Sequence, residues 1–334
     1  MTQAFAGALL GTAAGDALGL PFEGMTRARV RRFLRHRPLT HRIGLVSDDT
    51  EHACLVGQAL LEAGDDPDRF ARALAWRLRW WLAALPAAVG FATLRGIAKL
   101  WLGFHPGNSG VRSAGNGAAM RAPLIGVWAA GDAELRRALV RASTRITHVD
   151  PRAEEGAQVV AAGAALALGP PRPAEEVVEL LLHEVRDDAL GRALEAAATD
   201  EPLEDYAERL GQGCGVTGFV GHTVPIAVAA WLRHPLSFRD AIEDTVRLGG
   251  DTDTTAAIVG ALVGANTGPS GIPEEWLGGL RERPRSVEWM RALAERLATR
   301  GPPLRLSWPL IPLRNLAFLV VVLGMAGRRA LPPY

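Results

Sequence analysis

Four glycines recur at every fourth position near the start of the chain, at Gly7, Gly11, Gly15 and Gly19. Residues four apart lie on one face of an α-helix, so this spacing predicts a helix with one face that carries no side chains. Another helix or a ligand can approach such a face closely. Simple helix packing explains the glycines, but it does not explain Asp16 among them, nor Glu23 just after Pro21.

The helical pattern continues through most of the chain, with apolar residues at spacings of three and four. The clearest predicted helices cover residues 68–85, 133–144, 152–168, 174–185, 187–197 and 287–298. We find no alternation of strands and helices and no repeat of solenoid length. The prediction is an all-α chain with one multi-helix domain over residues 1–300 and a C-terminal helical extension over residues 301–334.

Charge and rare residues exclude several function classes. Lysine plus arginine number 37 against 36 for aspartate plus glutamate, so no overall charge draws the chain to nucleic acid. The single lysine, Lys99, disfavours Schiff-base chemistry. Cys54 and Cys214 lack metal-ligand spacing, and we expect buried thiols in a reducing compartment. The first residues do not resemble a signal peptide, so we expect a cytoplasmic protein.

The C-terminal extension contains the apolar run 316–323, which follows Pro309 and Pro312. This run is too short to cross about 30 Å of hydrocarbon, so we expect no membrane span. A buried terminal helix is the favoured interpretation. A membrane anchor and a partner-docking helix are the alternatives. Three tryptophans, Trp76, Trp80 and Trp81, have helical spacing and are also expected in the core.

Two acidic clusters stand before apolar helical stretches, at residues 47–51 and 249–254. The first reads Ser-Asp-Asp-Thr-Glu and the second Gly-Gly-Asp-Thr-Asp-Thr. Adjacent carboxylates repel unless a cation or hydrogen-bond donors compensate them, and Mg²⁺ prefers carboxylate, hydroxyl and water oxygens. Helix N-capping is the simpler explanation for either cluster alone. A shared metal site is the interpretation that accounts for both.

Two further junctions carry polar residues between predicted helices. The loop Gly115-Asn116-Gly117 precedes a helical segment, and its exposed amides suit a phosphate, although Asn-Gly is also common in turns. His148 lies in Thr-His-Val-Asp-Pro before another helix. A histidine there is either a cap or core hydrogen-bonding group, or a site residue.

In order, the motifs GDALGLPFEG, SDDTE, GNGAAMR, THVDP, GFVGHTVPIAVAAW and GGDTDT resemble those of the ADP-ribosylglycohydrolase family, over roughly residues 4–290. The resemblance implies an orthogonal all-α fold with two Mg²⁺ ions at the mouth of a cleft; Mn²⁺ also suits such ligands. The implied metal ligands are Ser47, Asp48, Asp49, Asp251, Asp253 and Thr254. Ser47 replaces a threonine that is usual in the family and keeps the hydroxyl.

The remaining site residues are also implied by the resemblance. Glu23, Asp48 and Asp49 are the implied catalytic residues, with Glu23 beside the ribose. Gly115, Asn116 and Gly117 correspond to a diphosphate-binding loop, His148 to a pocket histidine, and Gly218 and Phe219 to the pocket wall. One departure concerns Ala88, which stands where many bacterial members have an aspartate in Pro-x-Asp-x-Gly. Its absence weakens an assignment to ADP-ribosyl-arginine.

The resemblance implies a metal-dependent hydrolase that cleaves the glycosidic bond between ADP-ribose and an acceptor, either a protein side chain or a small molecule. We expect no nucleic-acid partner and favour a monomer. Two alternatives stay open. One is an inactive ADP-ribose-binding or crystallin-like relative, and the other is a metal-dependent hydrolase of nucleotide-sugar diphosphates, which would release AMP instead of ADP-ribose.

Overall fold

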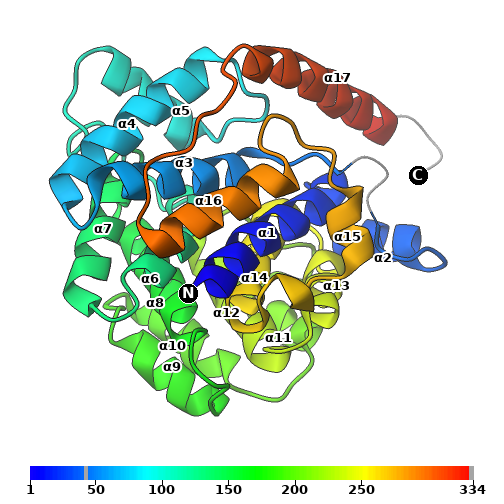
Figure 1. The fold of residues 1–334 in the computed structure, drawn as a ribbon. Coiled ribbons are helices and arrows are strands. Elements are labelled where there is room, and N and C mark those ends of the chain that lie inside the picture. The colour runs from blue at the N-terminus through cyan, green and yellow to red at the C-terminus, as the bar shows by residue number, and fades with distance from the viewer. Residues whose placement is uncertain (41–43, 331–334) are drawn as a thin grey trace.

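A computed structural model describes residues 1–40 and 44–330 (Figure 1). The part of the chain that it describes is all-α, as predicted, and its only extended pairings are isolated β-bridges. The last four residues of the predicted extension, 331–334, lie outside the described residues. The helices are α1 (Thr2–Gly19), η1 (Leu20–Phe22), α2 (Arg27–Leu34), α3 (Asp48–Ala63), α4 (Pro67–Ala83), α5 (Phe91–Trp101), η2 (Asn116–Arg121), α6 (Pro123–Trp128), α7 (Ala133–Arg145), α8 (Pro151–Leu166), α9 (Ala174–Leu182), α10 (Asp188–Ala197), α11 (Leu203–Arg209), α12 (Val220–Arg233), α13 (Phe238–Arg247), α14 (Thr252–Thr267), η3 (Pro269–Gly271), α15 (Glu274–Gly279), α16 (Val287–Thr299) and α17 (Leu310–Ala330).

Local sequence signals explain where many helices begin. A side-chain oxygen accepts a hydrogen bond from a first-turn amide at the start of six helices besides α3, and these capping residues are Asp66, Asp132, Asp150, Asp187, Ser237 and Ser286. Such caps satisfy backbone donors that have no partner within the helix. The helices predicted from apolar spacing are all present, with ends shifted by at most a few residues.

The glycine face of α1 packs against α14, and the two helices run antiparallel through the middle of the fold (Figure 1). A Cβ atom added at Gly7 would lie 1.9 Å from the carbonyl oxygen of Gly264, and one at Gly11 would lie 2.0 Å from that of Gly260. The glycines therefore serve helix packing, at backbone-to-backbone distance. At the end of this contact, a Cβ at Gly19 would lie 2.4 Å from the carbonyl oxygen of Thr252.

The α1 segment is also the one described helix that is long and apolar enough to cross a membrane by composition alone. Its apolar window is 94% buried within the protein, as expected of a core helix. A shorter apolar helix, Leu310–Gly324, lies within α17.

The expectation that the terminal helix is buried holds for only one face of α17. Ile311, Arg314, Asn315 and Phe318 point into the protein and are buried. On the other side of the helix, residues such as Leu316 are largely exposed. A helix that packs on one side of a domain buries one face, so the many apolar residues of α17 also occupy its exposed face.

Two smaller expectations are partly wrong. Trp81 is buried in the core, but Trp76 and Trp80 are 56% and 38% exposed, because they lie on the outer face of α4. Cys54 is buried as expected, whereas Cys214 is exposed in a turn between glycines. Helical spacing predicts which residues share a face of a helix, but it does not predict which face packs against the core.

We predict that Gly264→Ala lowers the free energy of unfolding by about 1–3 kcal/mol, because the new methyl group would overlap a neighbouring backbone. A Cβ at Gly264 would lie 2.1 Å from the carbonyl oxygen of Gly7, and a backbone atom has no rotamer in which to move away. Urea denaturation measures the change. The matched control is Gly278→Ala in exposed helical sequence with no atom within 4 Å, where the stability should change by less than about 1 kcal/mol. Equal losses in both variants would contradict close packing as the cause.

Candidate active site

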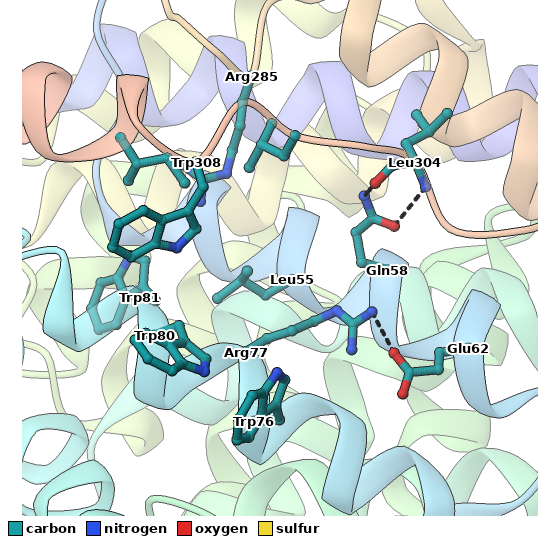
Figure 2. A pocket seen from close by; sticks show the side chains of 12 residues that line it. Leu55, Gln58, Glu62, Trp76, Arg77, Trp80, Trp81, Arg285, Leu304 and Trp308 are labelled. Atoms are coloured by element: carbon teal, nitrogen blue, oxygen red, sulfur yellow. Dashed lines mark hydrogen bonds and ion pairs between the residues drawn. The ribbon is translucent and has the colours of Figure 1, made fainter.

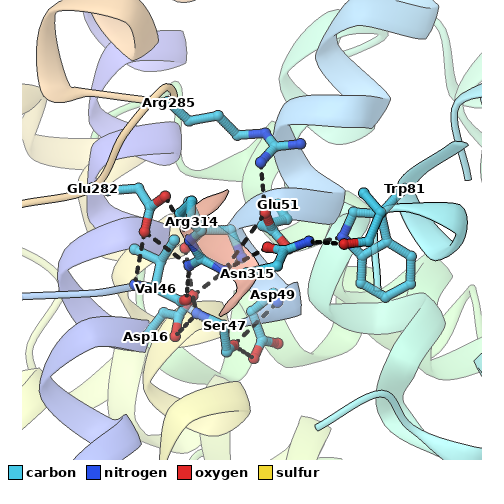
Figure 3. A network of polar contacts seen from close by, with 12 residues as sticks. Asp16, Val46, Ser47, Asp49, Glu51, Trp81, Glu282, Arg285, Arg314 and Asn315 are labelled. Atoms are coloured by element: carbon cyan, nitrogen blue, oxygen red, sulfur yellow. Dashed lines mark hydrogen bonds and ion pairs between the residues drawn. The ribbon is translucent and has the colours of Figure 1, made fainter. Parts of the chain in front are cut away.

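The first acidic cluster begins α3, and a buried aspartate of α1 holds its backbone (Figure 3). Both carboxylate oxygens of Asp16 lie 2.9 Å from the backbone amide of Ser47. One of them also accepts hydrogen bonds from the amide and the hydroxyl of Thr50. Burial raises the pKa of Asp16 to about 6, although these hydrogen bonds act in the opposite direction. Asp16 thus orients the residues on either side of Asp48 and Asp49.

The structure brings the two acidic clusters together. The hydroxyl of Ser47 donates a hydrogen bond of 2.8 Å to Oδ2 of Asp49. Thr254, from the second cluster at the start of α14, donates to the same oxygen at 3.3 Å. Ser47 also caps α3, so the capping interpretation is right for this residue. It does not explain Asp251, which stands at the N-cap position of α14 and makes no side-chain capping bond.

Like charges and burial dominate the electrostatics of this region. Burial, and then the neighbouring carboxylates of Asp16, Glu51 and Glu23, raise the pKa of Asp48 to about 8. The pKa values of Asp49 and Asp253 are raised well above their ordinary value, first by burial and then by neighbouring carboxylates. These carboxylates cannot all be ionised at neutral pH without a compensating positive charge.

Two buried oxygens in this region lack a hydrogen-bond partner, Oδ1 of Asp49 and Oδ1 of Asp253. Unpaired buried carboxylate oxygens are costly, and a divalent cation is one group that would satisfy them. Within residues 1–40 and 44–330, no three carboxylate, imidazole or thiol groups converge closely enough to form a preassembled metal cluster. The donor set therefore fits a hard cation in its chemistry, with hydroxyl and water oxygens needed to complete the coordination.

The loop around Asn116 contacts the second cluster. The side-chain amide of Asn116 donates to Oδ2 of Asp251 at 2.6 Å and to the hydroxyl of Thr223 at 3.0 Å. Its backbone amide donates to the carbonyl of Gly218, and Gly115 pairs with Phe219 across an isolated bridge. The structure thus joins the expected diphosphate loop to the expected pocket wall. The amide of Asn116 already has a partner, which removes one donor from a phosphate cradle built on this loop.

His148 lies against this glycine loop and is 2% exposed. Its Nδ1 lies 2.8 Å from the hydroxyl of Thr147, and a Cβ added at Gly117 would lie 3.1 Å from its ring. Burial, and then the positive charge of Arg121, lower the pKa of His148 to about 3, so the ring is neutral. In this position His148 supports the loop as a buried hydrogen-bonding group.

Arg121 is a supporting residue that the sequence alone did not single out. Its guanidinium donates to the carbonyl of Gly117 at 2.8 Å and to the hydroxyl of Thr147 at 2.7 Å, which links the loop to the histidine segment. The side chain is fully buried. Its place at the end of the GNGAAMR motif is the sequence feature that could have identified it.

Glu23 is half-buried just after η1, and backbone bonds hold its segment against the second cluster. The amide of Gly24 donates to the carbonyl of Gly250 at 2.8 Å, and the amide of Gly250 donates to the carbonyl of Met25 at 2.7 Å. The charge of Glu23 contributes to the raised pKa values of both Asp48 and Asp253. It therefore lies beside both clusters.

Comparison with known proteins places the chain in a family. The sequence model of one family, described as ADP-ribosylglycohydrolase, matches residues 1–305. The chain belongs to the ADP-ribosylglycohydrolase family. Two relatives match it in sequence over most of their length, and one solved structure shares its fold.

An uncharacterised protein of Archaeoglobus fulgidus is 32% identical, over 89% of this chain and 96% of its own length. The ADP-ribosyl-[dinitrogen reductase] glycohydrolase of Rhodospirillum rubrum is 29% identical, over 86% of this chain and 95% of its own length. A solved structure described as an ADP-ribosylglycohydrolase-related protein complex superposes with a TM-score of 0.69 at 29% identity, covering 90% of this chain and 98% of that one. Together these matches support ADP-ribosyl hydrolysis as the activity of the chain and identify it as a hydrolase.

Behind the acidic clusters, this member of the family has a buried ion network that sequence reasoning missed (Figure 3). Glu51, on α3, accepts hydrogen bonds from Arg285 and from the indole nitrogen of Trp81. Arg314, on α17, forms a two-point pair with Glu282, with nitrogen–oxygen distances of 2.9 and 2.8 Å. Arg314 comes from beyond residue 305, where the family match ends.

Arg314 and Glu282 together hold the residue that precedes Ser47. Arg314 donates to the carbonyl of Val46, and the amide of Val46 donates to Glu282 at 3.4 Å. Both polar groups of the Val46 backbone are thus fixed by one buried ion pair. The C-terminal helix is therefore part of the structure that positions the first acidic cluster.

We predict that Arg314→Met lowers the free energy of unfolding by about 3–5 kcal/mol, because it leaves the buried carboxylate of Glu282 without its partner. Hydrogen exchange should also quicken at residues 46–50, which lose their clamp. Arg305→Met is the control, since the Arg305 side chain is exposed on the same segment, and it should change stability by less than about 0.5 kcal/mol. Unchanged exchange at residues 46–50 in the Arg314 variant would contradict the clamp.

Proposed function

We propose that the chain hydrolyses the glycosidic bond between ADP-ribose and an acceptor, with two divalent cations, Mg²⁺ or Mn²⁺, held by the two acidic clusters. The ligands in this proposal are Ser47, Asp48, Asp49, Asp251, Asp253 and Thr254. The observation that carries it is the junction of the clusters, where Thr254 contacts Asp49 and where buried oxygens of Asp49 and Asp253 have no partner. These two unpaired oxygens have no evident structural use without a cation.

When bound, the cations would offset the carboxylate charges, hold the vicinal ribose hydroxyls and favour ionisation of water. The chain supplies the remaining chemistry. A carboxylate near the anomeric carbon supports the positive charge that develops as the bond to the acceptor breaks. Glu23 is the half-buried carboxylate beside both clusters, and we assign it the proton of the attacking water. The acceptor leaves with a proton, and the water oxygen becomes the new anomeric hydroxyl.

The other site residues bind and orient the ADP half. The backbone of the loop Gly115–Gly117 would hold the diphosphate, while Asn116 ties the loop to Asp251. His148 packs against both glycines and supports the loop from behind. Gly218 lies at the same place, since a Cβ added there would be 3.2 Å from the carboxylate of Asp251. Interactions of this kind hold the substrate in register with the cations and do not take part in bond breaking.

We predict that the purified chain releases free ADP-ribose from ADP-ribosylated acceptors in the presence of Mg²⁺ or Mn²⁺ and that EDTA abolishes the release. Asp253→Asn should lower the rate on the order of 100-fold or more, since even residues that only support a metal site are worth 10–100-fold. Mass spectrometry identifies the product. Asp188→Asn is the control, because Asp188 is an exposed acid in the first turn of another helix, and it should retain full activity.

Three outcomes would overturn the proposal or part of it. Release of AMP would indicate cleavage of the diphosphate instead. Binding of ADP-ribose without turnover on any acceptor would indicate an inactive binding protein. Full activity in EDTA would remove the cations from the mechanism while leaving the hydrolase assignment in place.

The connection between α4 and α5 is the segment that we propose contacts the acceptor. Ala88 is exposed there, with a φ of 59° that favours aspartate or asparagine over alanine. This connection leads into α5, where the hydroxyl of Thr93 is 3.3 Å from a Cβ added at Gly117. We propose that the chain acts on acceptors other than arginine, because it lacks a carboxylate at position 88 to pair with a guanidinium.

We predict that Ala88→Asp raises kcat/KM on an ADP-ribosyl-arginine peptide about tenfold, the effect expected of one hydrogen bond between charged groups. Activity on an ADP-ribosyl-serine peptide should not rise. Ala87→Asp places the same charge one position away and should have no such selective effect. A similar rise with both variants would show a general charge effect and contradict a specific contact.

A further inference from the structure

Helix α5 presents an apolar face to solvent next to the end of α4. Phe91 is 72% exposed, Trp101 49% and Leu102 78%. A large apolar surface of this kind, on an otherwise well-packed protein, marks a site of interaction. Phe104, which is 46% exposed, extends this apolar surface beyond the C-terminal end of α5.

Helix α17 lies along the same edge of the molecule as α4 and α5 (Figure 1), and its outer face is also apolar. Leu313, Leu316, Val320 and Leu323 are each between 61% and 65% exposed. They follow helical spacing on the side opposite Arg314, and no charged residue interrupts them. Asn315 donates to the carbonyl of Ala84 at the end of α4. The helix thus lies flat on the protein with its leucines outward.

Tryptophans connect the two helices. The ring of Trp80 lies 5.7 Å from that of Trp76, 5.7 Å from that of Trp101 and 6.0 Å from that of Trp308, which precedes α17. Trp76, Trp80 and Trp308 line a hollow of about 640 Å³ (Figure 2). We refer to this hollow, the exposed residues of α5 and the outer residues of α17 as the tryptophan–leucine face.

Two of the segments that form this face, residues 69–131 and the residues after Glu295, carry only positive charges. The sequence contains no aspartate or glutamate from residue 69 to residue 131, and none after Glu295. Arg95 and Arg305 are exposed on these segments, and Lys99 is partly exposed. Glu62, at the edge of the hollow, is paired with Arg77 at 2.6 Å. The chain as a whole is nearly neutral, so this separation of charge is local.

We propose that the tryptophan–leucine face binds the surface of a bilayer that contains anionic phospholipids. Exposed leucines bury in the boundary between headgroups and acyl chains, tryptophans favour that same boundary, and arginines are attracted to anionic headgroups. A second copy of the chain would bury the same apolar residues, but it would bring like charges together. The buried bonds of Arg314 and Asn315 hold α17 parallel to the surface, so the helix binds without crossing the bilayer.

Sedimentation with vesicles tests this inference independently of hydrolysis. The full-length protein should bind vesicles of equal parts phosphatidylcholine and phosphatidylglycerol, more weakly at high salt and more weakly still to phosphatidylcholine alone. Leu316→Glu and Leu102→Glu should each weaken binding by at least about tenfold, since each loses the burial of a leucine. Leu236→Glu is the control, at a leucine that is 63% exposed between α12 and α13, and it should bind as the wild type does.

Tryptophan fluorescence gives a second readout, and a blue shift on addition of anionic vesicles is expected. Circular dichroism checks that each variant is folded, and the two variants on different helices keep the test valid if one of them is not. The inference is overturned if the wild type binds no vesicles or if Leu236→Glu weakens binding as much as the others. It is also overturned if sedimentation velocity shows a dimer that Leu316→Glu dissociates and that does not bind vesicles.

Discussion

The contact between the backbones of α1 and α14 fixes the position of everything else in the site. Because no Cβ atoms separate the two helices, their relative position has almost no freedom, and residue 19 of one meets residue 252 of the other. The contact ends where Thr252 donates to the carbonyl of Gly19 at 2.8 Å. From there α1 leads to Glu23, and the first turn of α14 carries Asp253 and Thr254. The glycine contact between α1 and α14 takes no part in the proposed chemistry, but it sets the distance between Glu23 and the second acidic cluster.

The same packing forces acidic side chains close together, and the structure compensates them in different ways. Asp16 has backbone amides and a hydroxyl, and Asp251 has the amide of Asn116. Asp49 has two hydroxyls on one oxygen and nothing on the other. A carboxylate with hydrogen bonds to both oxygens, such as Asp16, serves the fold, whereas the unpaired oxygens of Asp49 and Asp253 are left for a cation. This division separates the supporting role of Asp16 from the ligand role proposed for Asp49.

The sequence was sufficient to predict the glycine contact and the meeting of the acidic clusters, because both are encoded in short, dense patterns. It was not sufficient for Arg314, whose partner Glu282 lies 32 residues away and whose target Val46 lies 268 residues away. An isolated arginine in an apolar helix gives no sign of its partner. It also could not tell that Trp76 and Trp80 are exposed, since spacing defines a helix face but not its neighbour. For His148, the sequence could not show the burial that lowers its pKa to about 3.

Helix α3 joins the proposed site to the tryptophan–leucine face. Its first turn carries Asp48 and Asp49. Leu55 and Gln58, further along the helix, line the hollow, and Glu51 lies between these two parts of the helix. The wall residues Trp81 and Arg285 both bond to Glu51. On the other side of this network, Arg314 holds Val46 from a helix whose outer face is apolar. A ligand or surface that displaced α17 would therefore act on the backbone that precedes Ser47, through bonds that are already in place.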